Sequence, residues 1–214
     1  MKQHPHPATH PLGCSVTLAN MPNCQVSLAL IDTETTGLDP AEDELIGMSI
    51  LLGRVDLHSG GLFQVLDRYT GWRQPGRFSR RAQRITGMNR AKLRGHSIDW
   101  SRVQRLIAQA DLLVGHAMDV DRSFLLPWLP QLAHKPVACS LRDIDWFGMQ
   151  GMERADIDYL AEVLGVSVEA STEGVPPERD CDTLSRILAQ PLPAEPDRTG
   201  FQALISAACR RTQG

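Results

Sequence analysis

Two acidic residues follow directly on an apolar run in Leu28-Ala29-Leu30-Ile31-Asp32-Thr33-Glu34-Thr35-Thr36-Gly37-Leu38. The apolar run predicts a buried strand. Because residues i and i+2 of a strand project from one face, Asp32 and Glu34 are expected side by side at its end. Two carboxylates that close repel each other unless a cation lies between them. Hard divalent ions such as Mg²⁺ or Mn²⁺ prefer these oxygen ligands.

The residues after the acidic pair predict a tight turn of small side chains, whose backbone N–H groups can face an anion. The pair alone would favour a solvated acidic strand end. The whole string, Asp-x-Glu-Thr-Thr-Gly-Leu after an apolar strand, resembles the first motif of the DEDD 3′–5′ exonucleases. That family includes the proofreading epsilon subunit of bacterial DNA polymerase III and ribonuclease T. The resemblance implies a ribonuclease H-like fold, in which a mixed central sheet carries helices on both faces.

A second stretch resembles the family's second motif, Val-x-His-Asn-x-x-Phe-Asp-x-x-Phe-Leu. It runs from Leu113 through His116 and Asp121 to Leu125. Asp121 stands on the metal-binding aspartate of the motif, and Phe124 and Leu125 stand on its core positions, on one helical face. Asp119 is the alternative ligand, but the residue four positions after it is Ser123, so we favour Asp121.

The second motif departs from the family pattern at two positions, with Ala117 in place of Asn and Val120 in place of Phe. His116 stands on the motif's histidine, which the resemblance implies orders the strand–helix junction and is not the general base. Between these motifs, Arg84-Ile85-Thr86-Gly87-Met88 resembles the family segment that lies near the 3′-terminal nucleotide. The resemblance thereby implies a substrate-binding set of Thr35, Thr36, Gly37, Leu38, Thr86, Met88 and His116.

The third motif, His-x-x-x-x-Asp before an apolar helix, is incomplete. Asp180 is the favoured ligand, because Leu184 and Ile187 continue its face as an apolar stripe; Asp182 is the alternative. The histidine expected five residues before Asp180 is absent, since position 175 is Val, and no histidine follows His134. The alternative to a metal site here is an acidic helix start that favours the helix macrodipole.

Composition indicates an ordinary globular protein. The chain has 214 residues, 42% hydrophobic and 22% charged, enough for one domain with a substantial core. Five scattered cysteines without a Cys-x-x-Cys pair argue against a disulfide framework or zinc site and favour the cytoplasm. No apolar run of membrane-spanning length occurs. Residues 1–24, rich in His and Pro, are expected to form a flexible tail.

Basic residues are concentrated in one segment of a chain whose net charge is −3. No Asp or Glu lies between Trp72 and Gly95. The segment contains Arg73, Arg77, Arg80, Arg81, Arg84, Arg90, Lys92 and Arg94. Such a segment suggests an anionic partner such as a nucleic-acid backbone; a solvated face that keeps the protein soluble is the equal alternative on charge alone.

The order of elements predicts three strands followed by alternating helices and strands, which is an α/β fold with a mixed sheet covered on both faces. Strands are expected at about 26–31, 45–53, 62–66, 112–115 and 136–139. Helices are expected at about 98–110, 121–132, 157–164, 181–188 and 200–209. We predict an exonuclease-like domain over 25–190 and, over 191–214, a linker with a C-terminal helix that packs on it.

The resemblance implies a 3′–5′ exonuclease that acts on single-stranded DNA or RNA ends through two Mg²⁺ or Mn²⁺ ions. Asp32, Glu34, Asp121 and Asp180 would be its catalytic metal ligands, and a DNA polymerase is a further expected partner. The absent histidine leaves a second hypothesis open: a catalytically degenerate module that binds nucleic acid or a polymerase without cleaving.

Overall fold

The computed structural model describes residues 25–57, 63–149, 152–168 and 177–211. Within them a mixed sheet has the strand order β3-β2-β1-β4-β5, in which β1 pairs antiparallel with β2 and parallel with β4. This confirms the expected α/β architecture. The strands are β1 (Gln25–Thr35), β2 (Leu45–Asp56), β3 (Phe63–Trp72), β4 (Leu112–Gly115) and β5 (Val137–Cys139). The expected tail, residues 1–24, lies outside the described residues.

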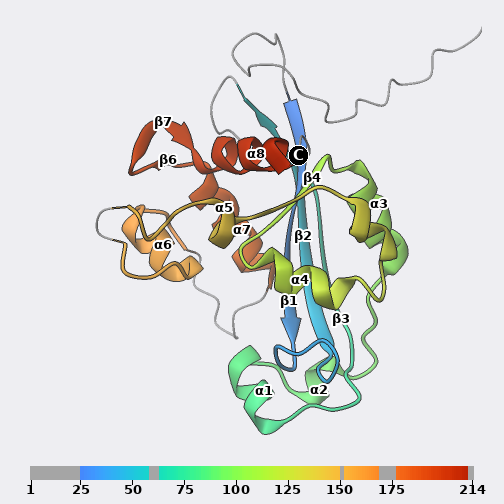
Figure 1. Ribbon diagram of the computed structural model, residues 1–214. Helices are drawn as coiled ribbons and strands as arrows, with labels where there is room; N and C mark the ends of the chain where they lie inside the picture. The colour runs from blue at the N-terminus through green and yellow to red at the C-terminus, as the bar shows by residue number, and fades with distance from the viewer. Residues whose placement is uncertain (1–24, 58–62, 150–151, 169–176, 212–214) are drawn as a thin grey trace, which may run out of the picture.

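Helices cover both faces of this sheet (Figure 1). On one face α3 and α4 pack against Ala29 and Ile31 of β1; on the other, α7 and α8 pack against Leu28 and Leu30. The alternation of β1 side chains therefore divides them between two cores. The helices are α1 (Arg80–Thr86), α2 (Arg90–Leu93), α3 (Trp100–Gln109), α4 (Met118–Leu125), α5 (Ser140–Asp143), α6 (Ile157–Val163), α7 (Pro177–Leu188) and α8 (Gly200–Arg211).

Several elements differ in extent from the sequence expectation. The helix expected over 121–132 begins earlier, at Met118, and ends at Leu125, after which a 3₁₀ helix covers Pro130–His134. Proline at 127 and 130 explains the early end, because proline cannot donate the helical hydrogen bond. The helix expected from 181 begins at Pro177, which suits a first helical turn. Both earlier starts place the candidate ligands Asp121 and Asp180 inside the first turns of their helices.

The C-terminal segment is more ordered than a linker. Two short paired strands, β6 (Pro191–Leu192) and β7 (Glu195–Thr199), lead into α8. This helix buries Phe201, Leu204 and Ile205 in the core shared with α7. No helix among the described residues is both long and apolar enough to cross a membrane.

Candidate active site

A cavity of about 410 Å³ opens where β1 ends, between the start of α4 and the starts of α6 and α7. Asp32, Asp121 and Asp180 line it, and they come from β1, α4 and α7 respectively. In α/β sheets, ligands bind outside the carboxyl ends of the strands, and β1 and the parallel strand β4 both end here. The fold thus gathers three of the four predicted metal ligands in one cavity.

Asp32 and Glu34 lie near the end of β1, opposite Ser49 and Gly47 of β2, and a register irregularity follows directly after Glu34. Burial raises the pKa of Asp32 well above its ordinary value, and the charges of Asp121, Asp180 and Glu34 raise it further. Burial, then Asp180 and Asp121, raise the pKa of Glu34 to about 8. Glu34 does not line the cavity, but these interactions place it within electrostatic reach of the other three carboxylates.

Asp121 is held against the end of β1. Its side chain is buried, and its Oδ1 accepts a hydrogen bond of 2.7 Å from the Thr33 hydroxyl. Burial raises the pKa of Asp121 to about 7, although the hydrogen bonds from Thr33 lower it. A Cβ at Gly115 would lie 3.0 Å from Asp121 Oδ2 and 3.2 Å from the carbonyl oxygen of Ile31, so this close approach requires a residue without a side chain.

The two alternative carboxylates lie elsewhere. Asp119 is 62% exposed and pairs with Arg142. Asp182 pairs with Arg68 on β3 at 3.3 Å, whereas Asp180 faces the cavity. Burial raises the pKa of Asp180 to about 6, against the lowering effect of Arg179. The structure therefore brings together the favoured residue of each pair.

The donor set fits a hard divalent cation, because four carboxylates supply only oxygen ligands. Besides burial, repulsion from the other carboxylates raises the pKa values of Asp32 and Glu34, and a bound cation would relieve this repulsion. Over the described ranges, no three His, Cys, Asp or Glu side chains are arranged so that they could already hold a metal ion.

Among the predicted substrate-binding residues, Thr35, Leu38 and His116 line the cavity, and Leu38 is 82% exposed. Thr36 instead stabilises the turn: its hydroxyl donates to Asp43 at 3.2 Å and accepts from the Glu44 N–H at 2.9 Å. A Cβ at Gly37 would clash with the Asp43 side chain, at 2.2 Å from Oδ2. Thr36 and Gly37 thus stabilise the turn after β1 through contacts with Asp43 and Glu44.

Thr86 and Met88 are not brought to the cavity. The Thr86 side chain is buried and donates to the carbonyl of Ala82 within α1. Met88 lines a separate hollow on α1. The spacing between these residues and the carboxylates along the sequence does not determine where α1 packs. The sequence motif therefore could not show whether Thr86 and Met88 reach the cavity.

Both ring nitrogens of His116 have partners. Nε2 lies 2.6 Å from the carbonyl oxygen of Ala155, and Nδ1 lies 3.3 Å from the Ser140 hydroxyl. Since a carbonyl only accepts, Nε2 carries the proton. Burial lowers the pKa of His116, although the Ala155 carbonyl raises it. A neutral histidine that joins the β4–α4 junction to two other segments agrees with an ordering role.

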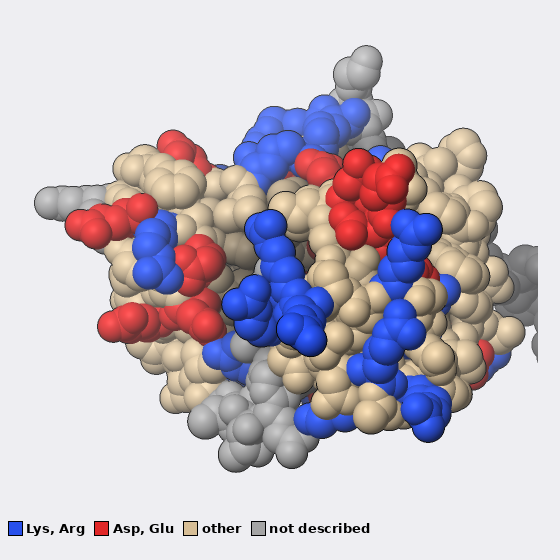
Figure 2. Space-filling view, turned by 90° about the horizontal axis from the view of Figure 1, so that it is seen from below, with Lys and Arg blue, Asp and Glu red and all other residues tan. Residues whose placement is uncertain are grey.

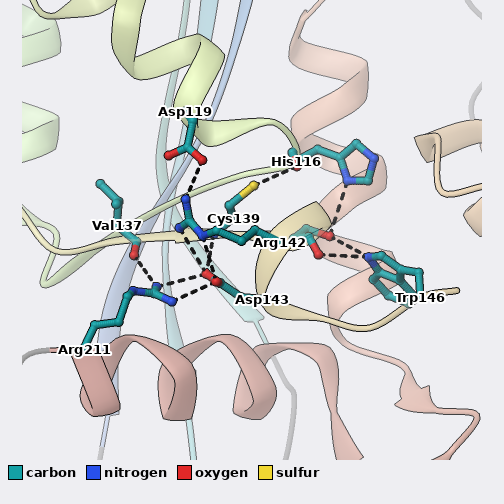
Figure 3. Close-up of polar contacts among 9 residues, drawn as sticks. His116, Asp119, Val137, Cys139, Arg142, Asp143, Trp146 and Arg211 are labelled. Atoms are coloured by element: carbon teal, nitrogen blue, oxygen red, sulfur yellow. Dashed lines mark hydrogen bonds and ion pairs between the residues drawn. The ribbon is translucent and has the colours of Figure 1, made fainter. Parts of the chain in front are cut away.

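An ionic brace, formed by Arg142, Asp143 and Arg211, connects the start of α4 to α8 (Figure 3). Arg142 pairs with Asp119 and, at 3.0 Å, with Asp143; Arg211 of α8 pairs with Asp143 at 2.8 Å. The Asp143 side chain is 4% exposed and also accepts from the Cys139 N–H at 2.8 Å. Burial alone would raise the pKa of Asp143, but these hydrogen bonds hold it below its ordinary value.

We expect Asp143→Ala to lower the free energy of unfolding by about 2–3 kcal/mol, because it leaves the Cys139 N–H and two guanidinium groups without their shared acceptor. Urea unfolding at neutral pH measures this, with the exposed Asp145→Ala as the control. Because the folded pKa is lowered, the stabilisation is present above pH 3.8 and disappears as the pH falls through the folded value. Equal effects of both variants would contradict the brace.

Three charged residues that line the cavity were not predicted as site residues from the sequence: Asp156, Asp158 and Arg179. Arg179 pairs with Asp158 and, at 3.5 Å, with Asp180, and its side chain is 16% exposed. Asp156 caps α6 by accepting from the Tyr159 N–H at 3.1 Å. The capping position of Asp156 was readable from sequence, but the pairing of Asp158 with Arg179 was not, because that contact joins two separate helices.

Two relatives are similar in sequence to part of this chain. No family model matches the chain. Over 138 residues, which are 63% of this chain, it is 31% identical to a PolC-type DNA polymerase III of Thermotoga petrophila and 30% identical to that of Thermotoga maritima. The chain spans about 8% of the length of these relatives.

Solved structures extend the similarity to the fold. Exonuclease X in complex with 5′ overhanging duplex DNA has a TM-score of 0.56 at 18% identity, over 76% of this chain and 89% of that one. An Escherichia coli ExoI–ssDNA complex has a TM-score of 0.57 at 15% identity, over 77% of this chain and 40% of that one. The chain shares its fold with these exonucleases. Its resemblance to this family is confirmed, as is the ribonuclease H-like architecture of its sheet.

Proposed function

We propose that this DEDD-fold chain is a 3′–5′ exonuclease that removes nucleotides from single-stranded DNA or RNA ends. The observation that carries the proposal is the meeting of Asp32, Glu34, Asp121 and Asp180, from three elements, at the end of β1. The named activities of the structural relatives, exonucleases in complex with DNA, support it. The similarity to PolC-type polymerases supports a DNA polymerase as partner.

The four carboxylates would hold two Mg²⁺ or Mn²⁺ ions, which when bound activate a water and stabilise the departing 3′ oxygen. The chain's own residues position this arrangement. Thr33 fixes the Asp121 carboxylate, and His116 fixes the junction from which α4 starts. Thr35 and Leu38, at the cavity wall, would border the terminal nucleotide.

The family's general base is a histidine five residues before the third-motif aspartate, and this sequence has Val175 there. Glu178 does not replace it, because it lies within reach of Arg68 and Thr70 on β3, at 3.8 and 3.4 Å, and does not line the cavity. A metal-bound water is already acidified, so cleavage would be slow rather than absent. The missing histidine also supports the second candidate function, a degenerate module that binds without cleaving. This module would comprise residues 25–190 and act in the cytoplasm.

The test is degradation of 5′-labelled single-stranded DNA and of matching RNA with Mg²⁺ or Mn²⁺, repeated with a chelator. We expect a ladder of 3′-shortened products that the chelator suppresses. Asp180→Asn should slow the reaction by about 100-fold, since a lost ligand weakens metal binding and charge stabilisation. The matched Asp182→Asn should leave the rate within about twofold, because Asp182 pairs outside the cavity. No ladder from folded protein would favour the binding module.

A further inference from the structure

The basic segment of the chain folds into a small unit of its own beneath the end of β1 (Figure 1). Phe78 and Ala82 of this unit pack with Leu93 of α2 and Ile46 of β2 in a separate core. Its first turn is fixed by Glu44, whose carboxylate accepts from the N–H groups of Gly76 and Arg77 at 3.1 and 2.9 Å. The unit is thus a rigid platform joined to the sheet that carries the carboxylates.

The ends of α1 are also defined. The Ser79 hydroxyl accepts from the Ala82 N–H at the start, and Gly87, at φ 66°, ends the helix in the left-handed conformation. Asn89 then caps α2 through Lys92 N–H. Capped ends stabilise a short helix, so α1 begins and ends at defined residues.

Arginines without acidic partners concentrate on this unit. Elsewhere, arginines such as Arg102, Arg142 and Arg211 pair with aspartates at 3.1 Å or less. In the described part of the chain, no ion pair involves Arg80, Arg81, Arg84 or Arg94, all of which are exposed. Figure 2, seen from below, shows several groups of Lys and Arg side chains across the middle of this face, with one group of acidic side chains between them and others toward the left edge.

An open hollow of about 570 Å³ lies on this unit, lined by Arg80, Gln83, Arg84 and Met88. Arg80 and Arg84 are four residues apart, so their guanidinium groups lie on one side of α1. Like charges at this spacing destabilise a helix unless an anion lies between them. Arginine presents a planar fork that matches phosphate oxygens in pairs, and Met88 adds an apolar, polarisable side chain.

We propose that this hollow, the α1 hollow, binds a phosphate of the nucleic-acid strand upstream of the terminal nucleotide. Arg80 and Arg84 hold the phosphate, and Met88 contacts the attached base. The inference rests on the proposed function for the direction of the strand, because the 3′ end then lies in the carboxylate cavity. It goes beyond that function by assigning a second binding site that contains no metal ligand.

The test is binding of a fluorescently labelled oligothymidylate over a series of salt concentrations, with a chelator present so that no cleavage occurs. Each phosphate contact contributes about 0.7 to the slope of log affinity against log salt for a single strand. Since the two arginines hold one phosphate, Arg80→Ala/Arg84→Ala should therefore reduce this slope by about 0.7. The control, Arg105→Ala/Arg210→Ala, removes two exposed arginines of α3 and α8 and should leave the slope unchanged.

The contact of Met88 distinguishes a nucleotide from a bare anion. Met88→Ala should weaken binding of oligothymidylate more than binding of an abasic strand with the same number of phosphates. An equal effect on both strands, or full competition by inorganic polyphosphate at equal charge, would assign the hollow to anions in general and overturn the proposal. An unchanged slope in the Arg80/Arg84 variant would also overturn it.

The outcomes separate this inference from the proposed function. Intact, salt-sensitive binding that requires Arg80 and Arg84, without any product ladder, would retain the α1 hollow and reject the exonuclease. A metal-dependent ladder with an unaltered salt slope would do the reverse. Melting temperatures of the arginine variants, which alter only exposed side chains, should match that of the wild type.

Discussion

Replacing Asp32 by Asn and Glu34 by Gln is expected to abolish cleavage and, at the same time, to stabilise the metal-free protein above neutral pH. Cleavage should fall by about three orders of magnitude or more, because both residues are proposed ligands of the ions that stabilise the reacting phosphate. Stability should rise because the same carboxylates are buried and repel each other. Such opposed effects are typical of sites that store strain for function.

The sign of the pH dependence follows from the raised pKa of Glu34. Its value is about 8 in the folded chain and 4.5 ordinarily, so between these pH values the folded state holds a proton that the unfolded state has lost. The free energy of unfolding of the wild type should then fall as pH rises, by roughly 1.4 kcal/mol per pH unit for each such group. The double variant should show a smaller fall, because Asp121 and Asp180, whose pKa values are also raised, still titrate in this range.

Urea unfolding with a chelator from pH 5 to pH 9 measures the effect. The control is Asp119→Asn/Glu162→Gln, which removes two exposed carboxylates of the same charge. A wild type whose stability is flat over this range would show that the carboxylates do not repel as the structure indicates. Adding Mg²⁺ to the wild type should restore the lost stability, since a ligand that binds only the folded state stabilises it.

Strand and helix periodicity predicted which carboxylates share a face of their element and so could meet at the site. Alternation along the first strand predicted that Asp32 and Glu34 share one face, and the helical stripe favoured Asp121 over Asp119 and Asp180 over Asp182. These are local relations, in which spacing along one element determines direction. That the four carboxylates act as ligands stays a prediction.

Contacts between separate helices and strands could not be predicted from the sequence. Arg179 and Asp158 meet because α6 and α7 start side by side, and no spacing along the chain encodes that contact. Met88 was expected to border the terminal nucleotide. It lies outside the carboxylate cavity and lines the α1 hollow, because the α1–α2 unit packs around its own core. The order of helices and strands was thus readable from periodicity, whereas the docking of short, polar segments depended on tertiary packing.

Introducing histidine at position 175 is expected to increase the cleavage rate. Val175 stands five residues before Asp180, where the family's third motif has its general base. A positioned base contributes about 10²–10⁴-fold, so Val175→His should gain at least the lower end of this range near neutral pH. Single-turnover degradation of a labelled strand with Mn²⁺ measures the gain, with Val175→Gln, which is polar but cannot act as a base, as the control.

The pH profile distinguishes a restored base from a general improvement in binding. Without a base, the wild-type rate should keep rising with pH, because hydroxide must replace it. In the Val175→His variant, the rate should level off above the pKa of the introduced imidazole, about 6.5 for an unperturbed histidine. Pro177→His, five residues before Asp182, tests the other register. A gain from position 177 and none from 175 would assign Asp182 as the ligand, whereas a gain from 175 alone would assign Asp180 and identify the missing base as the reason for slow cleavage.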